Sequence, residues 1–289
     1  MLRYTVRMSR LKGKDMNRKK GRLLAIPYII WIAGFTIIPL IFILVKAVTD
    51  VNGSLTSANL FAIFDPLHRK ALLMSLSVAF FSTLVCILIA YPAAIILRTS
   101  RITNKSIILF ILILPMWMNF ILRIFAVQLL ISNNGVLNNI LTAFNLPPLK
   151  IINTPWAILL GMVYDYLPYM MLPVLNSVLS IPEDVIEAAQ DLGSNRFRVL
   201  THIIFPLSLG GIGSGIIMVF VPSMTEFVIA NILGGGKIQL LGNIIEQEFT
   251  VTMDWNLGSG LSVSLMAFVL ITSMIFGRNN EDTAAGISL

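Results

Sequence analysis

The sequence predicts an all-α membrane protein with six transmembrane helices, and three observations support this fold class. The chain of 289 residues is 56% hydrophobic and 12% charged, whereas soluble domains carry about 25% charged residues. Six apolar runs in the chain are long enough to cross a bilayer, which needs about 20 residues. Lysine and arginine are unequally divided between the segments that join these runs, as expected for a membrane protein with a fixed orientation.

Residues 1–22 form a basic tail. Nine of the 21 lysines and arginines precede Leu23, which predicts a cytoplasmic location for this tail. A membrane anchor explains the formal charge of +7 more simply than nucleic-acid binding. The apolar run that follows is too long for a signal peptide, so we expect an uncleaved first helix. Met16 is an alternative start to Met1, because the basic residues after it already supply the anchor.

The transmembrane domain is expected over residues 23–277, followed by a C-terminal tail at 278–289. Its spans are expected at about 23–45, 71–97, 107–131, 156–179, 206–233 and 257–276. With six spans, fifteen basic residues lie on the side of the two tails and five on the other, while Arg123 lies within a span. We therefore expect both termini and segment 180–205 to be cytoplasmic.

Segment 180–205 is a polar stretch between the fourth and fifth apolar runs. Ser180 and Glu183 have the spacing of a capping box, and Gly193 suits the left-handed residue that ends a helix. Ser194 can cap a second short helix that runs to Pro206. The segment therefore predicts an exposed helix–glycine–helix unit, a shape that fits a groove on another protein.

This segment resembles the EAA loop of binding-protein-dependent ABC importer permeases. The residues that carry the resemblance are Glu187, Ala188, Ala189, Gly193, Ile203 and Pro206, with Phe205 in place of the usual leucine. The resemblance implies the type I ABC importer (MetI-like) architecture, with cytoplasmic EAA coupling helices that insert into a groove of an ATPase. Glu187 would then supply polar contacts, the two alanines would allow close approach, and Gly193 would make the bend.

The longer stretch from residue 23 to 276 is similar to the permeases of spermidine/putrescine importers. The similar motifs are Leu114-Pro115-Met116-Trp117-Met118-Asn119, Leu122-Arg123, Asn134-Gly135, Gly161-Met162-Val163-Tyr164, Leu167-Pro168 and Asp254-Trp255. The similarity implies a non-catalytic, multi-pass subunit of the bacterial inner membrane that imports polyamines. The implied partners are a second homologous permease, two copies of a cytoplasmic ATPase and an extracytoplasmic substrate-binding protein. ATP and magnesium would be used by the ATPase, so no cofactor is expected on this chain.

Charged residues within the apolar runs form a second candidate site. A charge in a span costs at least about 2.5 kcal/mol, so such residues usually face the bundle interior or water. Asp165 lies between two tyrosines, and an acidic, aromatic lining suits a cation. The candidate lining of a translocation path is Asp165, Tyr164, Tyr166, Glu226, Trp117 and Asn119. Arg123 is interpreted as a structural charge that pairs with Asp165 or Glu226.

Three alternatives to a polyamine permease are considered. An importer of the same family could carry iron, thiamine, sulfate or sugar. An ion-coupled secondary transporter could relay protons through Asp165 and Glu226, but it leaves the EAA spacing unexplained. A membrane enzyme would need clustered histidines or paired carboxylates, which the sequence lacks. The sequence also lacks a phosphate-binding loop, and its single cysteine, Cys86, gives neither an internal disulfide nor a zinc cluster.

Overall fold

The computed structural model of the chain describes residues 27–100, 107, 110, 111 and 113–285. The basic tail at 1–22 and the choice of start residue therefore lie outside the described residues. Within the described part, six helices are long and apolar enough to cross a membrane, which confirms the predicted fold class. They are Pro27–Ala47, Pro66–Thr99, Phe120–Ala143, Pro155–Leu179, Arg196–Thr225 and Trp255–Met274.

These six candidate spans, which are identified by length and composition, are built from one or several elements each. The first contains η1 (Ala33–Ile37) and α2 (Ile38–Ala47), the second is α4 (Pro66–Thr99), the third contains α6 (Phe120–Ile131) and α7 (Val136–Ala143), and the fourth is α8 (Pro155–Leu179). The fifth contains α10 (Arg196–Val199), η4 (Leu200–Ile204) and α11 (Phe205–Thr225), and the sixth is α14 (Trp255–Ala285). Shorter elements are α3 (Ala58–Phe61), η2 (Ala62–Phe64), η3 (Leu114–Trp117), α9 (Glu183–Asp191), α12 (Val228–Gly234) and α13 (Leu241–Thr250).

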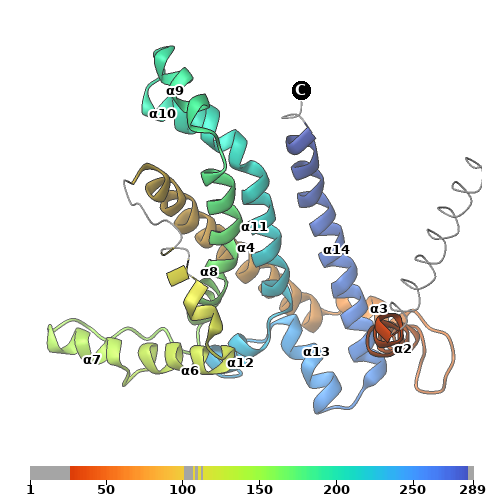
Figure 1. Cartoon of the computed structure of the whole chain (residues 1–289). Helices are drawn as coiled ribbons and strands as arrows, with labels where there is room; N and C mark the ends of the chain where they lie inside the picture. The colour runs from red at the N-terminus through yellow and green to blue at the C-terminus, as the bar shows by residue number, and fades with distance from the viewer. Residues whose placement is uncertain (1–26, 101–106, 108–109, 112, 286–289) are drawn as a thin grey trace, which may run out of the picture.

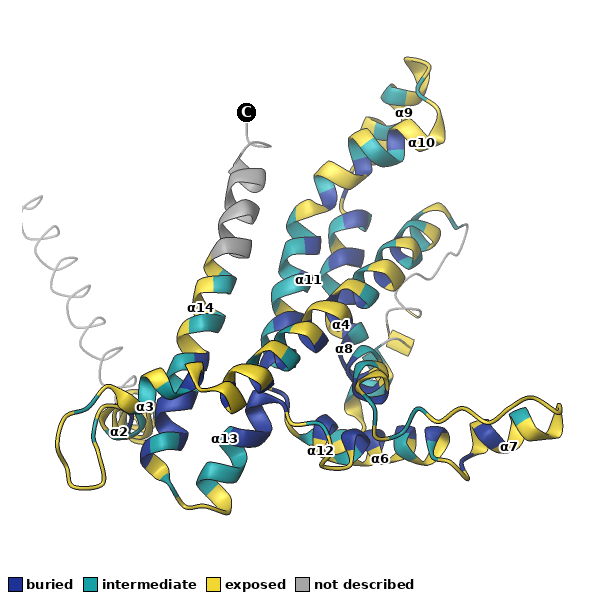
Figure 2. Ribbon diagram, turned by 180° about the vertical axis from the view of Figure 1, so that it is seen from behind, coloured by how far each residue is buried: buried dark blue, intermediate teal, exposed yellow. Residues whose placement is uncertain are grey.

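The two ends of the molecule differ in structure. Helices α8, α11 and α14 run between them, with α9 and α10 at one end and α12 and α13 at the other (Figure 1). We call these the coupling end and the base. Helices α6 and α7 run crosswise at the base (Figures 1 and 2). The helix–glycine–helix unit is therefore separated from α12 and α13 by the length of the long helices.

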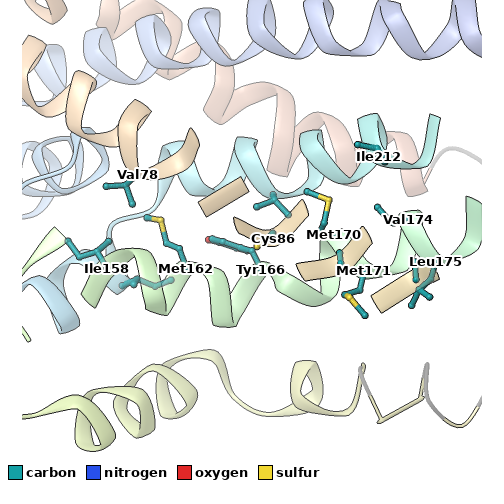
Figure 3. Packing of buried hydrophobic residues seen from close by; sticks show 14 of the residues in the cluster. Val78, Cys86, Ile158, Met162, Tyr166, Met170, Met171, Val174, Leu175 and Ile212 are labelled. Carbon is teal, nitrogen blue, oxygen red and sulfur yellow. The ribbon is translucent and has the colours of Figure 1, made fainter. Parts of the chain in front are cut away.

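The main core lies where α8 packs against α4 and α11. Met162, Met170 and Val174 of α8 are fully buried, together with Cys86 of α4, and Figure 3 shows them distributed along the packed helices, with Ile212 of α11. In a bilayer, such packing is driven by van der Waals contact because lipid tails are as apolar as the side chains. Helix α8 is thus the central element around which the other spans are placed.

Gly211 lies at a close approach of α11 to α8. A Cβ atom at this position would lie 2.6 Å from the carbonyl oxygen of Pro173 and would also clash with Ser177. Small residues at helix contacts allow backbones to approach in this way. The neighbouring Gly210 has no such contact, because nothing lies within 4 Å of an added Cβ.

The third span differs from the prediction of 107–131. The chain forms the single turn η3 at Leu114–Trp117, leaves the helical conformation at Met118 and begins α6 at Phe120. Asn119 starts α6 because its side chain accepts hydrogen bonds from the backbone N–H groups of Ile121 and Leu122, at 3.0 and 3.3 Å. Helical structure then continues in α7, within the segment between the third and fourth predicted spans.

The fifth span also differs from the expected 206–233. It begins at Arg196 because α10, the π-helical turn η4 and α11 follow one another without a loop. Pro206 lies in the first turn of α11, directly after that π turn, and such a turn accommodates a residue without an N–H donor. The helix ends at Thr225, and a separate short helix, α12, follows it.

We predict that Gly211→Ala lowers the stability of the protein by about 1–3 kcal/mol, because the added methyl forces α11 away from α8. Thermal unfolding of the detergent-solubilised protein measures this change. The adjacent Gly210→Ala is the matched control and should be neutral or slightly stabilising, since alanine favours the helix. Equal melting temperatures for the two variants would contradict the close approach.

Candidate functional site: coupling loop and intramembrane charges

Helix α9 begins and ends with recognisable signals. Glu183 and Asp184 lie in its first turn, where carboxylates favour the positive end of the helix dipole. At its end, Gly193 has a φ of +85°, and its N–H donates to the carbonyl of Gln190 at 2.8 Å. The next N–H, of Ser194, donates to Ala189 at 3.0 Å, which completes a Schellman motif. The predicted glycine stop is confirmed, and open space around Gly193 shows that the backbone conformation alone requires it.

Both predicted N-caps of this segment are wrong. Ser180 ends α8 instead of beginning α9, since its N–H donates to Asn176 and its hydroxyl to the carbonyl of Ser177. Helix α9 follows Pro182 and has no side-chain cap. The second helix is capped by Asn195, whose side-chain oxygen accepts from the N–H of Arg198 at 2.8 Å. Serine and asparagine are comparable caps, so the sequence alone does not separate Ser194 from its neighbour.

The EAA residues divide into an outer and an inner set. Glu187, Ala188 and Gly193 are exposed at the coupling end, whereas Ala189 and Ile203 pack against the main core. Pro206 is exposed in the first turn of α11. Two large apolar side chains nearby, Leu192 and Phe197, are 89% and 73% exposed, and Figure 2 shows the tip formed by α9 and α10 as largely exposed. The loop therefore presents a mixed polar and apolar surface suited to a protein partner.

The sequence did not identify Arg98 of α4 as a residue that contacts this loop. Its guanidinium donates to the carbonyl oxygens of Val178 and Ile181, and it lies 4.0 Å from a carboxylate oxygen of Glu183. Arg98 ends the second span, so its charge predicted only a cytoplasmic segment. Its partners are mainly backbone carbonyls about 80 residues away in the chain. Since every residue has a carbonyl, the residue types at these positions do not predict the contact.

Within the bundle, Arg123 of α6 forms an ion pair with Asp165 of α8. The residues are 5% and 3% exposed, and the guanidinium also donates to the carbonyl of Pro115 at 3.1 Å. A pair in such a position satisfies two charges that would each be unfavourable alone. The pairing is one of the two that the sequence allowed, and it joins the third span to the fourth.

Glu226 lies at the break between α11 and α12 rather than within a continuous span. One carboxylate oxygen accepts the hydroxyl hydrogen of Tyr166 at 2.5 Å. The other accepts from the N–H groups of Val228 and Ile229, at 2.8 and 3.1 Å. These N–H groups have no partner within the short helix, so the carboxylate caps α12. Glu226 thereby explains why the fifth span ends at Thr225.

The structure brings together four of the seven intramembrane candidates: Arg123, Asp165, Tyr166 and Glu226. The other three lie elsewhere. Tyr164 is 45% exposed and Trp117 is 76% exposed, the latter in edge contact with Phe110 at 5.9 Å between ring centroids. Asn119 caps α6. Adjacent residues of α8 thus take opposite roles, with Asp165 and Tyr166 in the interior and Tyr164 at the surface.

Comparison with known proteins gives a consistent result. The family described as "Binding-protein-dependent transport system inner membrane component" matches residues 17–280. The spermidine/putrescine transport system permease protein PotB of Haemophilus influenzae is 31% identical over 276 residues, which cover 93% of this chain and 96% of that protein. PotB of Escherichia coli K12 is 33% identical over 225 residues, covering 77% and 82%.

A solved structure shares the fold. The crystal structure of a bacterial alginate ABC transporter, in complex with an alginate pentasaccharide-bound periplasmic protein, contains a chain that superposes with a TM-score of 0.78. The match covers 92% of this chain and 95% of that one at 16% identity, so it shows the architecture and not the substrate. The family match over nearly the whole chain and the shared architecture lead to one conclusion: this protein belongs to the inner membrane components, or permeases, of binding-protein-dependent ABC importers.

Proposed function

We propose that this permease imports polyamines such as spermidine and putrescine. As a member of its family, the chain is a non-catalytic, multi-pass inner membrane subunit of an importer in which a partner ATPase hydrolyses ATP. The observation that carries the substrate proposal is the similarity to PotB of Haemophilus influenzae, which extends over 93% of this chain. A match that extends over 93% of the chain is more informative than one confined to the coupling loop, which importers of other solutes share.

The proposed assembly contains this chain, a second homologous permease, two copies of the ATPase and a substrate-binding protein on the opposite side. We place both termini and the coupling loop in the cytoplasm. Two observations support this orientation: the excess of basic residues on that side, and the position of the end of α14 at the coupling end of the molecule (Figure 1). ATP-driven closure of the ATPase would then move α9 and, through it, the spans.

In the path itself, we assign different roles to the candidate residues. Asp165 and Glu226 are buried and already bonded within the chain, so they act as braces that hold the lining in place. Tyr164 and Trp117 present exposed aromatic rings, and such rings can bind an ammonium group by cation–π contact. The polyamine would therefore contact aromatic rings as it moves, while the buried, partnered carboxylates hold the lining of the path in place.

Capture of the ATPase tests the coupling role. Glu187→Lys reverses a charge on the exposed face of α9, and Gly193→Asp places a side chain where φ is +85°. Each variant should lower the amount of cognate ATPase that co-purifies with the permease pair by about tenfold or more. Asp50→Lys is the matched control, because it reverses an exposed charge away from the coupling loop. Normal capture with both loop variants would refute the assignment.

Uptake into proteoliposomes tests the substrate. Vesicles that contain the complete complex, ATP and the binding protein should accumulate radiolabelled spermidine, and unlabelled putrescine should compete. Accumulation of iron, thiamine, sulfate or sugar in place of polyamine would overturn the substrate proposal while keeping the family. Uptake that persists without ATP would favour a secondary transporter.

The brace role predicts a specific pattern of stability. Asp165→Asn should destabilise the protein by about 3–5 kcal/mol, because it leaves the buried charge of Arg123 without its partner. Adding Arg123→Met should restore most of the loss, since a neutral replacement of the whole pair is often tolerated. Thermal unfolding of the single and double variants measures this. An Asp165→Asn protein with unchanged stability and reduced spermidine uptake would instead place the carboxylate in the path.

A further inference from the structure

Arg98, in the last turn of α4, holds the corner between α8 and α9. Its two terminal nitrogens donate to the carbonyl oxygens of Val178 and Ile181, the latter at 2.7 Å. The side chain is 7% exposed and also lies 4.0 Å from a carboxylate oxygen of Glu183, the first residue of α9. We infer that Arg98 is a positioning residue for transport, which makes α4 move together with the coupling loop. This inference rests on the proposed coupling of α9 to an ATPase.

The backbone of this corner explains why an arginine is needed. In a continuing helix, the carbonyl of Val178 would accept from the residue four positions later, but that residue is Pro182, which has no N–H. The carbonyl of Ile181 likewise does not receive the N–H of Val185, which donates to Asp184 instead. Neither carbonyl therefore receives the N–H four positions later, and unpaired buried carbonyls are unfavourable. The planar guanidinium satisfies both with one rigid group.

Without the guanidinium, the corner would transmit movement of α9 to the long helices poorly. The residues Ser180, Ile181 and Pro182 lie between α8 and α9, so they provide backbone angles that can rotate while the long helices stay in place. The guanidinium removes that freedom because it binds the last turn of α8 and the chain after it at the same time. Movement of α9 is then transmitted to the end of α4 as well as to α8.

Helix α4 extends from this corner to the opposite part of the molecule. Its 34 residues span roughly 50 Å at the rise of an α-helix. Near its other end, the hydroxyl of Ser75 accepts the N–H of Leu241, the first residue of α13, at 2.9 Å. Both groups are buried. The coupling end is therefore connected to the base by α8 and α11 through the continuous chain, and by α4 through Arg98.

The test measures transport per ATP hydrolysed in the complete complex reconstituted into proteoliposomes. Arg98→Gln should lower spermidine transported per ATP by at least about fivefold, within the range of typical coupling between sites, while ATP hydrolysis continues. Arg98→Lys keeps the charge but loses the fork geometry, so its ratio should lie between those of Arg98→Gln and the wild type. Arg69→Gln is the matched control, because it removes an exposed arginine from the opposite end of the same helix.

A ratio is used because it does not depend on how much complex assembles. Hydrogen exchange in the assembled complex adds a direct measurement: the amides of residues 183–187 should exchange faster in Arg98→Gln than in the wild type. A wild-type ratio in Arg98→Gln would overturn the inference. If that variant does not assemble, a wild-type ratio in Arg98→Lys overturns it. Failure of the proposed function looks different, because the wild-type complex itself would then show no ATP-dependent uptake.

Discussion

Polar groups buried in this bundle are best satisfied by partners within the chain, and that constraint accounts for three of the irregular parts of the structure. A span interior offers no water, so an unpaired N–H, carbonyl or charge is strongly unfavourable there. Three interactions solve this problem: the ion pair of Arg123 and Asp165, the capping of α12 by Glu226, and the hydrogen bonds of Arg98 to carbonyls at the corner between α8 and α9. Each lies where a helix begins, ends or is crossed by another.

Helix α8 connects these solutions. It supplies Asp165 to the ion pair, Tyr166 to the hydrogen bond with Glu226, and the carbonyl of Val178 that accepts from Arg98. It also occupies the centre of the main core, between α4 and α11. A force applied to α9 therefore reaches buried polar contacts and apolar packing through the same helix. Because packed interiors are dense and resist deformation, the bundle is expected to respond as connected rigid pieces and not by local yielding.

The sequence was informative wherever side-chain type alone decides the structure. Apolar runs gave the fold class, and Gly193 marked the end of α9 because few other residues adopt a φ of +85°. Boundaries were less accurate, since hydropathy does not distinguish a helix that stops at Thr225 from one that continues through α12. The sequence showed that Glu226 was unusual, but not that it caps a second helix. Arg98 was missed because every residue has a carbonyl, so partners of this kind cannot be predicted from residue types.

In the proposed function, the same constraint also separates substrate selectivity from the mechanical role of the buried charges. The acidic groups that first suggested a cation path are held by partners of the chain itself: Asp165 by Arg123, and Glu226 by Tyr166 and the start of α12. A carboxylate engaged in this way attracts a passing ammonium group less than a free one, because its oxygens are already ion-paired or hydrogen-bonded. Tight binding within the path would also slow release, since transport needs sites that the substrate can leave. In the proposed function, weak aromatic contacts over this interior would meet both requirements, and they would leave recognition of the substrate to the binding protein.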